Sequence, residues 1–239
     1  MRGLVPCPSW LSTAEAIVFD KDGTLIDLDT RWAPFFRSAF TVVADGDPDL
    51  LSRFETSLGV DGDRLVPNGP AAVSTPSEIL SRAHEVMEQA GWTIERRNDA
   101  LARGVAAAEM GPLVAIGDIV DAMSRLVGKG IKVAIATSDA RDNARAEISK
   151  LGIEPYISVL ACGDDDVVKP DPEVLRRCGR DLGIAMEHIV YVGDSQQDQR
   201  TANDAGIPFI EVRSAGSDGL GCEVWVRSIS EIADALDAG

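Results

Sequence analysis

The sequence predicts an α/β protein with a doubly wound, Rossmann-like parallel sheet as its core and an inserted α-helical cap subdomain. Two observations support this prediction. Short apolar runs rich in β-branched residues alternate with helical patterns over the second half of the chain, and one long helical interval separates the first such run from the second. Strands that alternate with helices favour a parallel sheet with right-handed crossovers.

Five segments have the composition of strands that are buried on both faces of a sheet. They are residues 16–20, 131–137, 157–162, 188–194 and 207–212. The segments between the last four have helical patterns, and each ends on a glycine, which suits the C-terminus of a helix. These helices are expected at residues 141–152, 171–183 and 196–206.

The first connection is the exception, because about 110 residues lie between the first and second strands, far more than one crossover needs. Its last part, residues 118–130, has the pattern of a crossover helix. Four other helical stretches precede it, and a Gly- and Pro-rich interval at residues 60–76 interrupts them. The stretches are 31–44, 48–59, 76–91 and 94–110. We therefore expect residues 1–27 and 112–239 to form the α/β core and residues 28–111 to form the helical cap.

The charge of the chain limits its partners. Acidic residues outnumber basic ones 39 to 23, which gives a formal net charge of -16. Such a field repels nucleic-acid backbones and anionic membranes, so neither is expected as a partner. A small anionic substrate remains compatible, because lysine, backbone N–H groups and a metal can reverse the sign within one cleft.

Cysteine usage and hydropathy indicate the compartment. The four cysteines are widely spaced and form no C-x-x-C pair, and a chain of this size does not need disulfides. No apolar run approaches the ~18 residues of a membrane span, and the first residues lack the apolar stretch of a secretory signal. We therefore expect a soluble, cytoplasmic protein with reduced thiols, whose oligomeric state the sequence leaves open.

Polar side chains follow four of the predicted strands, at the point where each strand ends. In doubly wound sheets the ligand site lies beyond the carboxyl ends of the strands, so these residues are the first candidates for chemistry. They are Asp20, Lys21, Asp22, Gly23 and Thr24, then Thr137, Ser138 and Asp139, then Lys169, and finally Asp194 to Asp198.

This collection of groups matches what phosphoryl transfer requires, namely positioning and neutralisation of charge on the phosphoryl oxygens. A carboxylate can attack phosphorus covalently, and magnesium takes oxygen ligands from one or two carboxylates, here Asp20 and Asp194. Hydroxyl and backbone N–H groups at Thr137 and Ser138, together with the Lys169 ammonium, could hold the remaining oxygens.

Four segments resemble, in order along the chain, the four motifs of the haloacid dehalogenase-like (HAD) hydrolase superfamily. They are DKDGTL at 20–25, Thr137 at a strand end, KPDP at 169–172 and GDSQQD at 193–198. The resemblance covers the core, about two-thirds of the chain. The single insert between the first two motifs is similar to the helical (C1-type) cap of phosphoglycolate phosphatase-like members.

The resemblance implies that Asp20 is the nucleophile and a magnesium ligand. It implies that Asp22 is the general acid/base and that its backbone carbonyl also binds the metal. Dehalogenase members of the superfamily lack a carboxylate at the position of Asp22, so its presence favours phosphate esters over halides.

The same resemblance assigns the other three motifs. Thr137 and Lys169 would bind the phosphoryl group, and Asp194 would be the carboxylate ligand of Mg²⁺. Asp198 would either contact a metal-bound water or orient Lys169. Both roles for Asp198 stay open at this point.

The sequence therefore predicts a magnesium-dependent phosphatase that acts on a small phosphorylated metabolite, of the phosphoglycolate or sugar phosphate type, through an aspartyl-phosphate. A phosphomutase on the same scaffold is an alternative, because it shares the aspartyl-phosphate. A non-catalytic receiver that is phosphorylated on Asp is a further alternative, although the large insert and Asp22 argue against it.

Two residues close behind the first motif, Arg31 and Trp32, are candidates to face the substrate. The simpler interpretation of Trp32 is structural, because Trp32, Phe35 and Phe36 have the spacing of one helix face and first indicate the core of the cap.

Overall fold

The computed structural model describes residues 7–213 and 219–238. The ends of the predicted core, residues 1–6 and 239, lie outside the described residues. The chain divides into two compact units, one formed by Met1–Asp27 with Ala115–Gly239 and the other by Leu28–Val114. Within the described parts of the chain, no helix has the length and apolar character needed to cross a membrane.

The first unit is built on a six-stranded sheet in the order β5-β4-β1-β6-β7-β8, and every pair of neighbouring strands is parallel. The strands are β1 (Ala16–Phe19), β4 (Lys132–Ala136), β5 (Ile157–Ala161), β6 (Ile189–Gly193), β7 (Phe209–Val212) and β8 (Trp225–Val226). After β5 the chain passes to the other side of β1 and forms β6. The strand order therefore reverses beside β1, which places the carboxyl ends of β4, β1 and β6 next to one another. A doubly wound α/β fold is confirmed.

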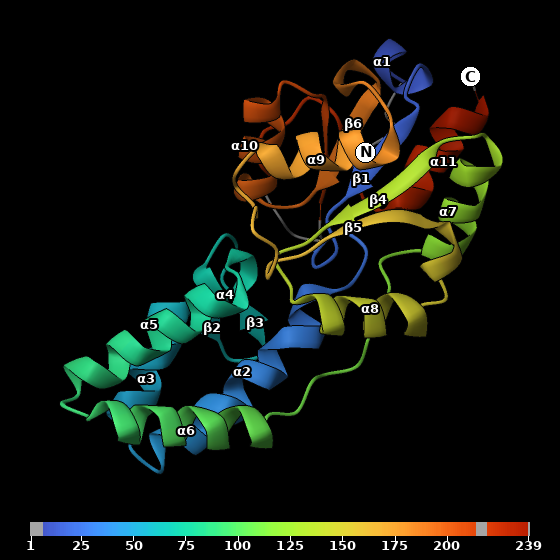
Figure 1. Ribbon diagram of the computed structural model, residues 1–239. Coiled ribbons are helices and arrows are strands. Elements are labelled where there is room, and N and C mark those ends of the chain that lie inside the picture. The colour runs from blue at the N-terminus through green and yellow to red at the C-terminus, as the bar shows by residue number, and fades with distance from the viewer. Residues whose placement is uncertain (1–6, 214–218, 239) are drawn as a thin grey trace. The chain divides into compact units, whose positions relative to one another are not determined.

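Helices cover both faces of this sheet, with α9 and α10 on one side and α7 and α11 on the other (Figure 1). The helices are α1 (Ser9–Ser12), α7 (Ile119–Gly128), α8 (Arg141–Lys150), α9 (Glu173–Leu182), α10 (Gln196–Ala205) and α11 (Ile229–Ala238), with 3₁₀ turns at Glu154–Tyr156 and Met186–His188. Ala16 and Val18 pack in the cluster that contains Val174 and Leu175 of α9. Burial on both faces explains why the central strands have continuous apolar sequences.

Strand β5 differs from the sequence prediction. We expected it to be buried on both faces, but four of its five residues are half-buried or exposed. The reason is its position, since β5 is an edge strand of the sheet. Strand β8 was not predicted, because a two-residue strand is too short to show a period.

The second unit consists of five helices and one small hairpin. Its elements are α2 (Leu28–Ala44), α3 (Pro48–Leu58), β2 (Val60–Asp61), β3 (Arg64–Leu65), α4 (Pro70–Val73), α5 (Pro76–Gln89) and α6 (Ile94–Ala107). Local signals fix the helix starts: Asp47 caps α3, and Thr75 forms a capping box with Glu78 at the start of α5. The hairpin and α4 lie in the interval 60–76, where the sequence predicted only an interruption.

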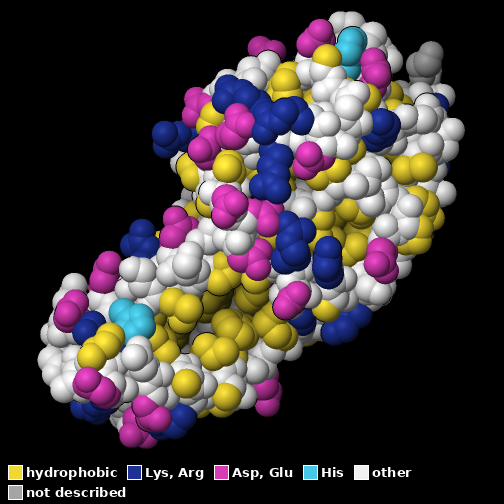
Figure 2. Space-filling view, in the orientation of Figure 1, with side chains coloured by type: hydrophobic (Ala, Val, Ile, Leu, Met, Phe, Trp, Pro, Cys, Tyr) yellow, Lys and Arg dark blue, Asp and Glu magenta, His cyan; other side chains and the backbone are white. Residues whose placement is uncertain are grey.

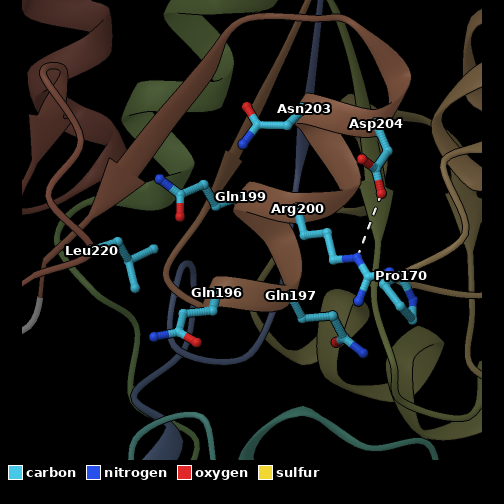
Figure 3. A pocket seen from close by; sticks show the side chains of 8 residues that line it. All are labelled: Pro170, Gln196, Gln197, Gln199, Arg200, Asn203, Asp204 and Leu220. Carbon is cyan, nitrogen blue, oxygen red and sulfur yellow. Dashed lines mark ion pairs between the residues drawn. The ribbon is translucent and has the colours of Figure 1, made fainter.

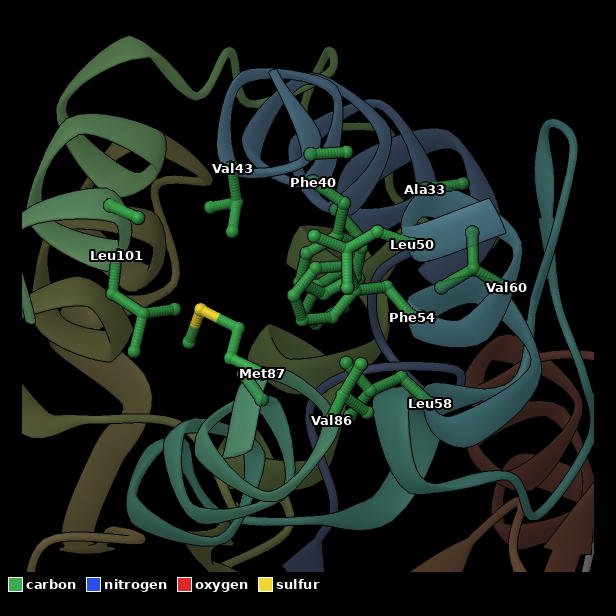
Figure 4. Close-up of a cluster of buried hydrophobic side chains, with 14 of the residues drawn as sticks. Ala33, Phe40, Val43, Leu50, Phe54, Leu58, Val60, Val86, Met87 and Leu101 are labelled. Atoms are coloured by element: carbon green, nitrogen blue, oxygen red, sulfur yellow. The ribbon is translucent and has the colours of Figure 1, made fainter. Parts of the chain in front are cut away.

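The helical unit has a hydrophobic core of its own (Figure 4). A row of aromatic rings on α2 continues onto α3: Phe36 stacks on Phe40 with ring centroids 5.8 Å apart, and Phe40 stacks on Phe54 at 4.9 Å. The Phe54 side chain is completely buried. On the face shown in Figure 2, acidic and basic side chains are interspersed.

We expect Phe54→Ala to lower the free energy of unfolding by about 3–5 kcal/mol, because it removes a buried ring and leaves a cavity. Leu80→Ala is the matched control: Leu80 lies on α5 of the same unit but is 43% exposed, so its loss should change stability by less than about 0.5 kcal/mol. Urea unfolding followed by circular dichroism measures both values. Equal effects of the two substitutions would contradict the assignment of this core.

Candidate active site

Three carboxylates meet beyond the carboxyl ends of β1 and β6. Asp20 directly follows β1, Asp194 directly follows β6, and Asp198 lies in the first turn of α10. One oxygen of each lies within 4.8 Å of the others. Because β1 and β6 are neighbours in parallel register, two motifs that are far apart in the sequence supply one cluster.

Lys169 lies among these carboxylates. Its Nζ donates to Asp20 Oδ1 at 2.5 Å and to Asp198 Oδ1 at 2.8 Å. All three side chains are buried, so solvent screens these ion pairs little. The structure therefore brings the first, third and fourth motifs into direct contact.

Asp198 is held more firmly than its neighbours. Besides Lys169, its Oδ1 accepts a hydrogen bond from the Tyr191 hydroxyl at 2.7 Å, and its Oδ2 accepts from Ser195 Oγ at 2.6 Å and Ser195 N at 3.2 Å. Both oxygens are thus engaged by groups of the chain. Of the two roles that the sequence left open, this arrangement favours orientation of Lys169.

Tyr191 was not among the predicted site residues. It lies on β6 within an apolar run, where a tyrosine is indistinguishable from a core aromatic by sequence alone. Ser195 caps α10 and forms a capping box with Asp198. The S-x-x-D spacing was a usable signal for this contact.

Two glycines permit the close approach of these loops. Gly23 has φ +89°, and a Cβ there would lie 2.2 Å from Asp194 Oδ2. A Cβ on Gly193 would lie 2.5 Å from the Cβ of Asp198. Thr24 adds a hydrogen bond from its Oγ1 to Asp194 Oδ1 at 3.2 Å. A side chain at Gly23 of the first motif or at Gly193 of the fourth would therefore clash with the carboxylates, which explains the glycine at each position.

The protonation of the cluster reflects burial and crowding. Burial raises the pKa of Asp20 to about 7, against the opposing effect of Lys169. Burial and the charges of Asp20 and Asp198 raise the pKa of Asp194 well above its usual value. Burial would raise the pKa of Asp198 as well, but Lys169 and the hydrogen-bond donors outweigh it and lower that pKa. If all three carboxylates were ionised, their negative charge would exceed what Lys169 offsets, and the raised pKa values favour protonation instead.

The donor set of Asp20, Asp194 and Asp198 fits a divalent cation with a preference for oxygen ligands. A cation there would relieve the repulsion that raises the pKa of Asp20 and Asp194. The side chain of Asp22 is not a member of this group. The predicted metal contact of Asp22 concerns its backbone carbonyl.

Thr137 and Ser138 follow β4, the other neighbour of β1. The Thr137 side chain is buried, and its Oγ1 accepts a hydrogen bond from Asp139 N at 3.1 Å, which leaves the hydroxyl proton as a donor. Ser138 Oγ lies 3.4 Å from Gln197 Oε1. Both residues thus follow the carboxyl end of a strand, as Asp20 and Asp194 do.

Asp22 pairs with a different lysine. Its Oδ2 lies 2.7 Å from Nζ of Lys21, whose side chain is fully buried. Lys21 Nζ also contacts Asp139 Oδ2 at 3.1 Å and Glu147 Oε2 at 2.5 Å. Burial alone would lower the pKa of Lys21, but the three carboxylates outweigh it and the pKa is raised.

The two candidate substrate-facing residues lie in the helical unit. Arg31 is buried, and its Nη1 donates to Gly111 O at 2.5 Å while its carbonyl accepts from Gly111 N at 3.0 Å. Trp32 is half-buried and lies against Phe35 and Phe36, with ring centroids 5.6 Å and 6.1 Å away. Both sets of contacts are structural, and a substrate contact of either residue stays a prediction.

A separate hollow of about 580 Å³ runs along α10. Figure 3 shows its lining, which consists of Pro170, Gln196, Gln197, Gln199, Arg200, Asn203, Asp204 and Leu220. The two charged side chains of this lining pair with each other, Arg200 Nε to Asp204 Oδ2 at 3.5 Å. The charges of these two side chains in the hollow therefore offset each other.

Comparison with known proteins identifies the family. The model of the haloacid dehalogenase-like hydrolases matches residues 14–206. The chain belongs to this family. Two phosphoglycolate phosphatases are similar along most of their length: that of Cupriavidus necator, plasmid-encoded, is 31% identical over 92% of both chains, and that of Rhodobacter capsulatus is 29% identical over 82% of this chain and 83% of its own.

A solved structure supports the fold. The HAD phosphatase from Thermococcus onnurineus superposes with a TM-score of 0.65 at 18% identity, over 93% of this chain and 97% of its own. The protein is thus a phosphoglycolate phosphatase-like HAD hydrolase, an enzyme of the phosphatase class. The prediction of this family is confirmed, and the alternative of a non-catalytic receiver is set aside.

The raised pKa of Asp20 predicts how stability depends on pH in the absence of metal. The unfolded state releases this proton near pH 3.8 and the folded state near pH 7, so the folded state binds more protons in between and loses stability as pH rises. Between about pH 4.5 and 7.5, the free energy of unfolding of the wild type should fall by about 2–4 kcal/mol more than that of Asp20→Asn. Urea unfolding in the presence of chelator measures both values. Mg²⁺ should reduce this loss. Parallel pH curves for the two proteins would contradict the assignment.

Proposed function

We propose that this protein is a magnesium-dependent phosphatase that hydrolyses a small phosphorylated metabolite through an aspartyl-phosphate on Asp20. The observation that carries the proposal is the position of Asp20, whose Oδ1 lies 2.5 Å from the Lys169 ammonium in a group of three carboxylates, of which Asp20 and Asp198 are buried. The carboxyl ends of the parallel strands thus carry all the proposed groups together: the nucleophile, a cation for the phosphoryl oxygens and the ligands of a metal.

In the first step a carboxylate oxygen of Asp20 attacks phosphorus, and the bond from phosphorus to the ester oxygen breaks. Asp22 gives its proton to the departing ester oxygen, which leaves as an alcohol. Thr137, Ser138 and Lys169 donate hydrogen bonds to the equatorial oxygens, whose charge they stabilise.

In the second step water attacks the phosphorus of the aspartyl-phosphate. Asp22, now ionised, takes a proton from that water, and the bond between phosphorus and the Asp20 oxygen breaks. Inorganic phosphate leaves and Asp20 is regenerated. Lys169 keeps its orientation through Asp198, whose own position depends on Tyr191 and Ser195.

The cation would be held by carboxylate oxygens of Asp20 and Asp194 and by the backbone carbonyl of Asp22. When bound, magnesium neutralises charge between the nucleophile and the phosphoryl group. This role agrees with the crowding of carboxylates described above.

The similarity to two phosphoglycolate phosphatases supports phosphoglycolate, or a sugar phosphate of similar size, as the substrate. We further propose that the unit Leu28–Val114 serves as the helical cap of the enzyme. A cytoplasmic location is part of the proposal, and the four unpaired cysteines support it.

A panel of phosphorylated metabolites, assayed with Mg²⁺ and with excess chelator, tests the reaction and its substrate. We expect release of inorganic phosphate from phosphoglycolate or a sugar phosphate, and its loss with chelator. A phosphomutase would instead produce an isomeric phosphate without stoichiometric release. Full activity in excess chelator would contradict the metal assignment.

The role of Asp22 can be tested by choice of leaving group. With Asp22→Asn an alkyl phosphate should fail at the first step, whereas p-nitrophenyl phosphate needs little protonation and should still phosphorylate Asp20. We expect about one equivalent of nitrophenol in a rapid phase, followed by turnover slowed about 10²-fold or more. Rapid-quench kinetics measures this phase, and Asp20→Asn should show none. Steady turnover of Asp22→Asn on both substrates at the parent rate would contradict the role of Asp22.

A further inference from the structure

Lys21 is a fully buried lysine that the proposed reaction does not use. It stands between the proposed nucleophile and the proposed acid/base in the sequence, and its Nζ contacts three carboxylates: Asp22 Oδ2 at 2.7 Å, Asp139 Oδ2 at 3.1 Å and Glu147 Oε2 at 2.5 Å. An ammonium is costly to bury without a partner. One or two carboxylates would balance its charge, so the third contact calls for another explanation.

The three carboxylates differ in their other contacts. Asp139 also accepts from Asn143 Nδ2 at 2.6 Å and from Ala140 N at 2.7 Å, and Glu147 lies fully buried on α8. These two belong to the frame of the fold. Asp22 has the most exposed of the three side chains, at 14% against 4% for Asp139 and 1% for Glu147. It is the member that can reach a substrate.

Lys21 is also fixed at its backbone. Its carbonyl accepts from Leu25 N at 2.9 Å and Ile26 N at 3.0 Å, which closes the turn that carries the first motif. Its side chain then runs to α8, where Glu147 holds it. Lys21 is therefore anchored at both ends, and Asp22 is the partner whose orientation it can determine.

We propose that Lys21 is a positioning residue that fixes the carboxylate of Asp22 for proton transfer, with Glu147 and Asp139 holding its ammonium in place. The proposal rests on the proposed function, in which Asp22 is the acid/base. The contact of Lys21 Nζ with Asp22 Oδ2 would then fix where the other carboxylate oxygen of Asp22 lies. An error of about 1 Å in such a group can cost about 10²-fold in rate.

The test removes Lys21 together with the charge of Glu147, its buried partner. The double variant Lys21→Met/Glu147→Gln replaces the buried ion pair by uncharged groups, a change that such sites often tolerate, while Asp139 keeps Asn143 and Ala140. Glu147→Gln alone is the matched control, because it keeps the contact between Lys21 and Asp22. Thermal unfolding with Mg²⁺ establishes that both variants are folded.

We expect the double variant to turn over an alkyl phosphate about 10–100-fold more slowly than Glu147→Gln. The rapid release of nitrophenol from p-nitrophenyl phosphate, and the Kd of inorganic phosphate, should agree within about threefold between the two variants. A merely structural role of Lys21 would change all three quantities together. Equal alkyl phosphate turnover in the two variants would overturn the proposal.

A crystal structure of the double variant provides a second test that does not depend on activity. We expect the Asp22 carboxylate to leave its wild-type position or to occupy several positions. One well-ordered carboxylate in the wild-type position would overturn the proposal. Absence of the rapid nitrophenol phase in Asp22→Asn would contradict the aspartyl-phosphate itself, whereas the position of the Asp22 carboxylate in this crystal structure would still test the role of Lys21.

Discussion

A single ammonium group, Nζ of Lys169, lies among the carboxylates at the ends of β1 and β6 and offsets part of their repulsion. It pairs with Asp20 and Asp198 but not with Asp194. Burial, together with the charges of the neighbouring carboxylates, raises the pKa of Asp20 and Asp194. Two buried carboxylates and a half-buried one with a single cation are costly to the metal-free fold. The same shortage of positive charge favours binding of a divalent cation. The cost in stability of the metal-free fold and the proposed chemistry therefore have the same cause.

The first motif places two carboxylates two residues apart in different surroundings. Asp20 faces Lys169, whereas Asp22 faces Lys21. The turn that continues after Asp22 requires the positive φ of Gly23, where a side chain would collide with Asp194. The proposed nucleophile and the proposed acid/base therefore pair with separate lysines, and the Asp22 side chain is the more exposed of the two, at 14% against 6% for Asp20. Separate environments for paired carboxylates are a general way to give them different roles.

The sequence was sufficient for the features that have a local signal. Periodicity and turn chemistry predict the central strands, the polar residues that follow them and the glycines of the motifs. Long-range partners did not follow: Glu147 meets Lys21 across 126 positions, and Tyr191 has the sequence environment of a core residue. The hairpin β2–β3 and strand β8 were missed because two-residue strands show no period. The half-buried state of β5 depends on its edge position, which only the topology determines.

Hydrogen bonds join the first and last segments of the insert to each other, and another joins the two core segments between which the insert lies. Arg31 and Gly111 exchange hydrogen bonds at the ends of the insert, and Ile116 N donates to Leu25 O at 2.9 Å on the side of the core. When the entry and exit of an insert are adjacent, its length adds little to the entropy cost of closing the loop. The insert also has its own core around Phe54. The hydrophobic core of the insert thus consists of its own residues, whereas the residues proposed for the reaction follow the strands of the other unit.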